Sequence, residues 1–281
     1  EKMIKKTAQD QRLPPNLPPQ DFEQLPEKPG VYYFYNQEKK VVYVGKAVNI
    51  KKRVASHFSG NSVTQQRQHF LRDIHAISFE LCATELMALL LECSEIKKLW
   101  PVYNRALKRF EAKFGLYQYE ARNGYQYLAV GKLAKFQTCI QTFNTEYEGI
   151  NVLRSLQEKF GIDYRFCKYG RLAEGAFFRQ EDENDLPEMK LHNQQIKEAI
   201  ISLRMSRPTF SIIDKGRSAD ERSCIWVEDG AFYGMGYFAS DIGFTDPTEV
   251  RDYVTPYKSN QYIMQLLYSF VEKYPGKVMQ H

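Results

Sequence analysis

Residues Tyr43–Val54 read YVGKAVNIKKRV, a stretch that predicts the end of a short strand followed directly by a basic helix. Val41–Val44 is rich in β-branched residues, and Asn49 is a good N-cap for a helix over Ile50–Phe58. Just upstream, Val31–Tyr35 predicts a second strand, with a polar turn between the two. The sequence therefore predicts a β-hairpin that leads into a helix.

Polar side chains follow this hairpin in chain order. Lys46 comes directly after the second strand, and Arg53 and His57 lie four residues apart on the helix, so that both project from one face. Further on, Thr84 is a suitable N-cap for a long apolar helix, which Pro101 ends because proline lacks a backbone donor.

One carboxylate interrupts the apolar surface of this long helix. Glu92 follows three leucines and falls at the edge of the apolar stripe, where a carboxylate can be half-buried and still reach a metal ion. A hard divalent cation held by few carboxylates keeps most of its water ligands. The sequence therefore indicates one metal ion, Mg²⁺ or Mn²⁺, at Glu92.

Together these side chains suit the hydrolysis of a phosphodiester. The reaction needs a nucleophilic water, a base for its proton and positive charge at the phosphate. Arg53 can bind a phosphate oxygen through its planar set of donors. Tyr32 and Tyr43, one on each strand, are candidate bases if Lys46 or the metal lowers the tyrosine pKa. His57 titrates near neutrality and can share or relay the proton.

Four segments in this order resemble the GIY-YIG nuclease domain, and most closely that of the UvrC/Cho excision-repair endonucleases. They are PGVY at Pro29–Tyr32, YVGKAVNIKKRV at Tyr43–Val54, ALLLE at Ala88–Glu92 and PVYN at Pro101–Asn104. The resemblance implies a metal-dependent, structure- or damage-directed DNA endonuclease that makes a single-strand incision in DNA repair. The active-site residues that it implies are Tyr32, Tyr43, Arg53, Glu92 and Asn104, with Lys46 in support.

The general base stays open among three side chains. His57 stands where the UvrC family usually has a tyrosine, whereas the family expects a hydroxyl at both strand positions. Tyr32 is therefore favoured as the base, with Tyr43 orienting the water or the phosphate and His57 assisting.

Positive charge is concentrated in the same part of the chain. Residues 26–110 hold 14 Lys and Arg against 7 Asp and Glu, a net of +7, while residues 111–281 hold 21 against 23, a net of −2. Such a distribution is typical of a phosphate-binding surface. The residues expected to bind DNA are Lys46, Lys51, Lys52, Arg53, Arg105 and Lys108.

The chain as a whole predicts an α+β protein in three parts. Residues 1–25 are proline-rich and predict an extended linker. Residues 26–110 are the GIY-YIG domain, a short β-sheet flanked by helices, and residues 111–281 predict a second α+β domain of unnamed fold. The whole chain also resembles the C-terminal part of bacterial proteins that fuse a proofreading-type exonuclease to a Cho-like nuclease.

Composition excludes several other classes of protein. The five cysteines form no CxxC pair, which argues against a disulfide framework or a zinc knuckle, and Cys167 alone cannot hold a metal cluster. No apolar run approaches the roughly 20 residues that span a bilayer. We expect a cytoplasmic protein with DNA and other excision-repair proteins as partners, and no membrane association.

Two rival functions are considered. A DNA-binding module without catalysis would bind but not nick, and a sequence-specific restriction or homing nuclease would need a separate base-reading element. Asp214, at the end of an apolar strand, only faintly resembles a residue of the second UvrC nuclease and is predicted to be a turn residue.

Overall fold

The computed structural model describes residues 13–59, 64–105, 112–134, 138–169 and 186–281. Lys108 and the first twelve residues of the predicted linker lie outside these ranges. The chain contains helices and sheets, as the predicted α+β class requires. Among the described residues, no helix combines the length and the apolar character needed to cross a membrane.

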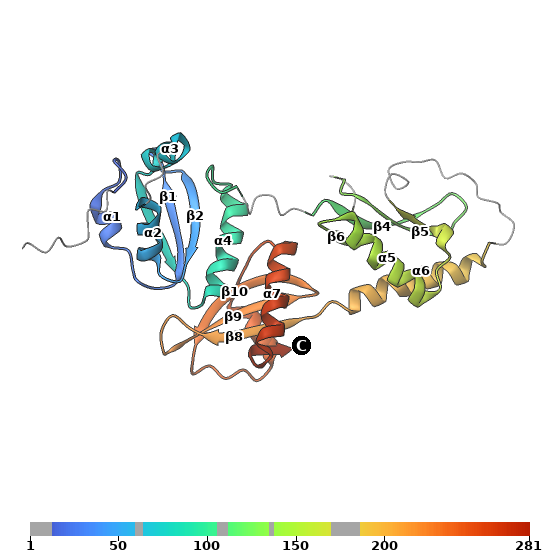
Figure 1. Cartoon of the computed structure of the whole chain (residues 1–281). Helices are drawn as coiled ribbons and strands as arrows, with labels where there is room; N and C mark the ends of the chain where they lie inside the picture. The colour runs from blue at the N-terminus through green and yellow to red at the C-terminus, as the bar shows by residue number, and fades with distance from the viewer. Residues whose placement is uncertain (1–12, 60–63, 106–111, 135–137, 170–185) are drawn as a thin grey trace, which may run out of the picture.

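A three-stranded antiparallel sheet with helices forms the N-terminal part (Figure 1). Its strands are β1 (Gly30–Tyr35), β2 (Val41–Ala47) and β3 (Ala76–Leu81), in the order β2-β1-β3. Its helices are α2 (Ile50–Phe58), α3 (Gln65–Asp73) and α4 (Glu85–Leu99). The predicted hairpin and both predicted helices are confirmed, and the side chains of Asn49 and Thr84 accept the backbone N–H groups of Lys52 and Met87 as N-caps.

Helix α3 and strand β3 were not predicted from the sequence. The α3 segment, QQRQHFLRD, has no buried residue, and β3 lies at an edge of its sheet with its side chains only partly covered. The α3 segment therefore lacks the apolar periodicity on which a prediction from sequence depends, whereas Ile77, Phe79 and Leu81 of β3 do alternate with polar residues, so this strand signal was present in the sequence and was missed.

The extended linker predicted for residues 1–25 is wrong for its described part, residues 13–25. These residues include a short helix, α1 (Pro19–Glu23), and Leu17 and Leu25 are buried in a cluster with residues of β1 and α2. The Asp21 carboxylate also accepts the Ile77 N–H of β3 at 3.0 Å. Apolar burial thus holds this segment against the N-terminal sheet.

The described residues between 113 and 205 build a second sheet with its own core (Figure 1). Its strands are β4 (Phe114–Glu120), β5 (Gln126–Lys132), β6 (Gln141–Phe143) and β7 (Cys167–Tyr169), in the order β6-β4-β5-β7. Helices α5 (Glu146–Phe160) and α6 (Met189–Met205) supply the rest of this core. Strands β4 and β5 form an antiparallel hairpin, and Thr145 is the N-cap of α5.

The C-terminal part is an antiparallel five-stranded sheet with one long helix. The strands are β8 (Phe210–Lys215), β9 (Glu221–Glu228), β10 (Ala231–Ala239), β11 (Val254–Pro256) and β12 (Val278–Gln280), in the order β11-β10-β9-β8-β12. Helix α7 (Gln261–Lys273) has Asn260 as its N-cap. Short 3-10 helices span Tyr164–Phe166, Pro247–Tyr253 and Pro275–Lys277.

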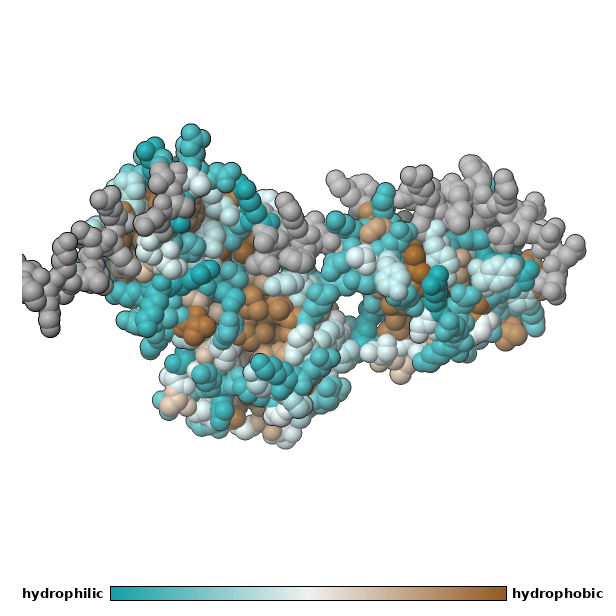
Figure 2. Space-filling view, viewed as in Figure 1, coloured by the Kyte–Doolittle hydropathy of each residue, from teal (hydrophilic) through white to brown (hydrophobic). Residues whose placement is uncertain are grey.

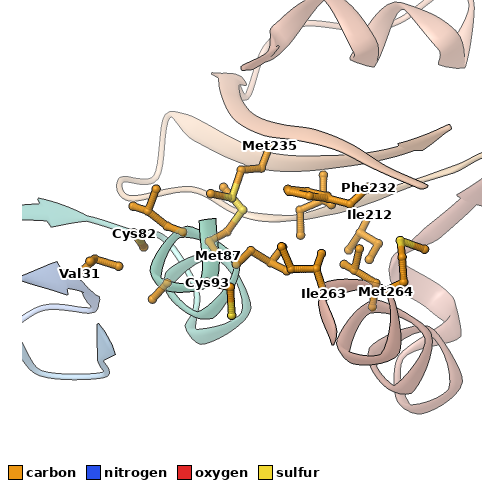
Figure 3. Close-up of a cluster of buried hydrophobic side chains, with 14 of the residues drawn as sticks. Val31, Cys82, Met87, Cys93, Ile212, Phe232, Met235, Ile263 and Met264 are labelled. Atoms are coloured by element: carbon orange, nitrogen blue, oxygen red, sulfur yellow. The ribbon is translucent and has the colours of Figure 1, made fainter. Parts of the chain in front are cut away.

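Helix α4 lies between the N-terminal sheet and the C-terminal sheet. Figure 3 shows Met87 of α4 on the side of the helix that faces Phe232 of β10 and Ile263 of α7, with Cys93 on the same helix. All four side chains belong to one buried apolar cluster, which also includes residues of β1 and β2. Figure 2 shows apolar side chains reaching the surface in the region of α4 and α7. The C-terminal sheet therefore contributes side chains to the apolar core in which α4 is packed.

The stretch predicted to form one α+β domain contains two sheets with separate apolar clusters. The cluster of β4–β7, α5 and α6 shares no residue with the cluster that joins the C-terminal sheet to α4. We therefore propose that residues 111–281 comprise two units, of which the second belongs structurally with the N-terminal sheet.

Removing a large side chain from this shared core should loosen α4. Phe232→Ala should lower the free energy of unfolding by about 3–5 kcal/mol, since a buried ring is replaced by a cavity. Hydrogen exchange should then show reduced protection in α4. Phe238→Ala, on the same strand but in a different cluster, is the control. Equal α4 protection in the two variants would contradict a shared core.

Candidate active site

Strands β1 and β2 and helices α2 and α4 contribute side chains to one pocket. Five of the seven predicted catalytic residues line it: Tyr32, Tyr43, Lys46, Arg53 and Glu92. The other residues around it are Gly45, Ala47, Val48, Asn49, Lys52 and Ser56. Residues that are up to 60 positions apart in the sequence thus gather around one opening.

Tyr32 projects from the central strand β1 and is fully buried. Its hydroxyl lies 2.6 Å from Nε2 of His57 on α2. Burial raises the pKa of Tyr32 far above its usual range, and the Arg53 guanidinium acts in the opposite direction. The Tyr32 hydroxyl is therefore protonated in the free protein and shares a short hydrogen bond with the imidazole.

His57 does not line the pocket but lies behind the two tyrosines. Its ring centroid is 5.7 Å from that of Tyr32 and 5.2 Å from that of Tyr43. Burial lowers the pKa of His57 to about 4, and the positive charges of Arg53 and Arg67 act in the same direction. The imidazole is therefore neutral at pH 7 and can accept a proton from Tyr32.

Tyr43, on β2, shares the same aromatic environment. Its ring centroid is 6.1 Å from that of Tyr32. Burial and the negative charge of Glu92 raise the Tyr43 pKa, while Arg53 lowers it. Arg53, and not Lys46 as expected from the sequence, is thus the cation that favours a tyrosinate at either position.

Gly45 explains how the Tyr32 ring fits beside β2. The two residues are paired across the sheet, and a Cβ built on Gly45 would overlap the hydroxyl and Cζ of Tyr32. The glycine stands within the predicted motif, but the pattern of the motif alone assigns it no role. Only a residue without a side chain permits the close approach.

A methyl group at Gly45 should displace the Tyr32 hydroxyl from the pocket. If the chain is a nuclease, we expect Gly45→Ala to lower nicking by about 10²-fold, the lower end of the range for a mispositioned general base. Gly243→Ala is the matched control, because a Cβ there meets nothing within 4 Å. Wild-type nicking by purified Gly45→Ala would show that the position of the Tyr32 ring does not matter.

Glu92 projects from α4 into the pocket. Its Oε1 accepts the backbone N–H of Lys46 at 3.0 Å, which fixes the carboxylate against the end of β2. Burial raises the Glu92 pKa, whereas this hydrogen bond and the charges of Lys46 and Arg53 lower it. The carboxylate is therefore held in place and electrostatically balanced by two cations.

The donor set at Glu92 fits a divalent cation held through one carboxylate. Glu92 is the only acidic side chain among the described residues that line the pocket. Within the same part of the chain, no three His, Cys, Asp or Glu residues gather in a way that could hold a metal. An ion at Glu92 would therefore take most of its ligands from water and from the substrate, as Mg²⁺ commonly does.

Lys46 contributes differently from its predicted supporting role. Its Nζ lies 2.8 Å from Oε1 of Glu85, a side chain that also emerges from α4. Its backbone N–H donates to Glu92. Lys46 thus joins the end of β2 to α4 through both its backbone and its side chain.

Asn104 is buried and lies outside the pocket lining. Its side-chain amide accepts the N–H of Val44 and donates to the carbonyl of Val44, each at 2.8 Å. Both polar atoms of the amide therefore engage the backbone of β2. This geometry favours a role in holding the end of the α4 segment against β2 over direct contact with a substrate.

The residues predicted to bind DNA differ in their surroundings. Lys51 donates to the backbone carbonyl of Glu23 at 3.0 Å, and Lys52 is exposed, 4.0 Å from the carboxylate of Glu27. Arg53 and Arg105 are exposed. The exposed residues Lys52, Arg53 and Arg105 are therefore the better placed of the set for phosphates.

Other polar residues considered from the sequence are engaged elsewhere. Lys277 Nζ lies 2.6 Å from a carboxylate oxygen of Asp214, which gives that aspartate an ion-pair partner in the C-terminal sheet. His192 is fully buried, with Nε2 2.9 Å from the carbonyl oxygen of Gln126. Neither residue lies in the pocket.

Comparison with known proteins places the similarity on the part of the chain that bears the pocket. The family model of the UvrC-like GIY-YIG domain matches residues 28–105. UvrABC system protein C of Methanosarcina barkeri is 43% identical over 88 residues, which are 31% of this chain and 17% of the relative. The protein of the same name from Neisseria meningitidis serogroup A is 36% identical over 118 residues, 40% of this chain and 18% of the relative.

A solved structure is also similar. It is the GIY-YIG N-terminal endonuclease domain of UvrC from Thermotoga maritima, bound to its catalytic divalent cation, magnesium. The identity is 30%, the match covers 31% of this chain and 94% of that one, and the TM-score is 0.28. The present chain spans less than a fifth of the length of the two curated relatives named above.

Proposed function

We propose, from the UvrC-like GIY-YIG domain that residues 28–105 form, that this chain is a divalent-metal-dependent DNA endonuclease. It makes a single-strand phosphodiester incision in a structure- or damage-directed reaction of DNA repair, as UvrC/Cho-type enzymes do. The observation that carries the proposal is the convergence of Tyr32, Tyr43, Arg53 and Glu92 on one pocket.

Each side chain has a distinct part in the proposed hydrolysis. Glu92 would hold one Mg²⁺ or Mn²⁺, which when bound supplies Lewis-acid stabilisation of the phosphate and the leaving oxygen. Arg53 binds a non-bridging phosphate oxygen with its guanidinium donors. Lys46 keeps the Glu92 carboxylate in position through its backbone N–H.

The proton of the attacking water is taken up by the tyrosine–histidine pair. Tyr32 accepts the proton of the water on its oxygen while it donates its own hydroxyl proton to Nε2 of His57. The 2.6 Å hydrogen bond and the neutral imidazole support this relay, because Tyr32 need not ionise beforehand. Tyr43, beside Tyr32, orients the water or the phosphate.

An incision assay on the full chain tests the proposal. Plain, damaged and branched DNA duplexes would each be incubated with Mg²⁺, with Mn²⁺ or with EDTA. We expect nicking that requires the metal and is faster on damaged or branched DNA. Binding without nicking under every metal condition would instead identify a DNA-binding module, and cutting at one fixed sequence would identify a restriction- or homing-type nuclease.

The affinity of the chain for DNA should fall steeply as the salt concentration rises, and it should depend on the N-terminal part of the chain. Each phosphate neutralised by Lys or Arg should contribute a slope of about −0.9 to a log–log plot of affinity against salt. Replacing Lys52 or Arg105 with alanine should make this slope shallower, by about one unit for each phosphate that is no longer neutralised. Lys197→Ala, on α6, is a control that should leave the slope unchanged. An unchanged slope in the Lys52 and Arg105 variants would contradict this surface.

The protein partners that we propose for this chain are inferred from the same relatives. The relatives belong to the UvrABC system, so we propose that this chain also acts with other excision-repair proteins on DNA.

A further inference from the structure

Trp100, directly after α4, combines high exposure with an unfavourable backbone conformation. Its side chain is 52% exposed, and its backbone lies in the left-handed region at φ 49° and ψ 52°. A bulky residue rarely adopts this conformation, and glycine is the usual residue at this position after a helix. Neither burial nor backbone preference therefore accounts for a tryptophan here.

The surroundings of the ring suit a nucleic acid. Lys97 Nζ lies 5.7 Å from the Trp100 ring centroid, and Lys98 and Arg105 are exposed nearby in the sequence. Lys98 lies 3.5 Å from the Glu95 carboxylate, and Lys97 is the lysine whose ammonium group lies over the ring. An aromatic face flanked by cations is how proteins bind unpaired bases.

Trp100 also lies within reach of a strand bound in the pocket. It follows Glu92 by eight residues along α4, or about 12 Å at 1.5 Å per residue. One DNA strand advances about 3.4 Å per nucleotide when its bases are stacked. A strand whose phosphate sits at Glu92 can therefore place a base at Trp100 within about three to four nucleotides.

We propose that Trp100 is a stacking platform for an unpaired base of the DNA, a few nucleotides from the scissile phosphate. The inference rests on the proposed nuclease function and narrows its substrate to DNA with unpaired bases beside the cut. A base inside a regular duplex is covered by its neighbours and offers no face to the ring.

The test compares two DNA duplexes of the same length, one fully paired and one with a short internal bubble. Binding to the full-length protein is measured in EDTA, so that no cleavage occurs. Trp100→Ala should bind the bubble about 5- to 150-fold more weakly than the wild type, since one stack is worth about 1–3 kcal/mol. Affinity for the paired duplex should not change. Val102→Ala, a neighbouring exposed apolar residue, is the control and should bind both DNAs normally.

Tryptophan fluorescence gives an independent readout, because the chain has only two tryptophans and Trp226 is buried at 2% exposure. Bubble DNA should quench the wild-type signal, and Trp100→Phe should remove that quenching while it retains part of the affinity.

Trp100→Gly separates stacking from a structural role. Glycine relieves the left-handed conformation, so this variant should melt at or above the wild-type temperature and still bind the bubble as weakly as Trp100→Ala. Bubble binding by Trp100→Gly at wild-type strength would overturn the inference, even if the wild type nicks DNA. Failure of the wild type to nick would overturn the proposed function alone and leave the binding result intact.

Discussion

Glu92→Gln should reduce metal-dependent nicking by about 10³-fold, which corresponds to roughly 4 kcal/mol of transition-state stabilisation. Glutamine retains an oxygen that can accept the Lys46 N–H, so the fold and the position of α4 should persist while the charge that holds the metal is removed. Nicking is measured in single turnover over a range of Mg²⁺ concentrations, and DNA affinity is measured separately.

The matched control for this prediction is Glu95→Gln. Glu95 is also a half-buried carboxylate on α4, but it does not line the pocket. DNA affinity should remain within about twofold in both variants, because phosphate contacts come from Lys and Arg. Metal-dependent nicking by Glu92→Gln at the wild-type rate would remove Glu92 from the mechanism.

Tyr32→Phe should lower the single-turnover rate by about 10²- to 10⁴-fold with little loss of stability, because only the hydroxyl that takes the proton is removed. Tyr43→Phe should lower the single-turnover rate by a smaller factor if Tyr43 only orients the water or the phosphate. Tyr33→Phe is the control, since Tyr33 is also buried on β1 but packs into the cluster around α4. Near-normal nicking by Tyr32→Phe, with an unchanged melting temperature, would exclude Tyr32 as the base.

The pH dependence distinguishes the role of His57. The sequence alone predicted that His57 titrates near neutrality, but burial lowers the His57 pKa to about 4. The part of the pH dependence that comes from His57 should therefore be a fall in rate as the pH drops through about 4, where the protonated imidazole can no longer accept the Tyr32 proton. His57→Gln should be slow at every pH and lack this acid limb. A limb near pH 6.5 in the wild type would contradict the buried, neutral imidazole.

The same pKa shift has a consequence for stability. The unfolded chain takes up a proton at His57 near pH 6.5, before the folded chain does, so His57 contributes stability above that pH that is lost as the pH falls toward 4. The difference in melting temperature between the wild type and His57→Gln should therefore change over this interval and be constant above it.

Local features of the sequence determined the elements that carry the site. The N-caps Asn49 and Thr84 and the stop at Pro101 fixed α2 and α4, because each depends on backbone groups within a few residues. The two runs of β-branched and aromatic residues, with the polar turn between them, determined the β1–β2 hairpin in the same way. The order of motifs then placed Tyr32, Tyr43, Arg53 and Glu92 on these elements, and all four line the pocket.

Only the tertiary structure decided what each of these residues contacts. The amide of Asn104 bonds to Val44, Lys46 pairs with Glu85 and not with a tyrosine, and Gly45 makes room for the Tyr32 ring. These contacts join residues that are distant along the chain or on facing strands, and their geometry depends on how the elements pack.

The sequence likewise did not predict that the C-terminal sheet packs against α4. Phe232 and Ile263 have the apolar periodicity of any core residue, and nothing in that periodicity says that their partners are Met87 and Cys93 on α4. Hydrophobic burial is non-directional. The apolar pattern of a strand or helix therefore indicates which of its faces is buried, but not which other element packs against that face. The sequence by itself determined which side chains line the pocket, and the packing of α4 between two sheets determined how they are held in place.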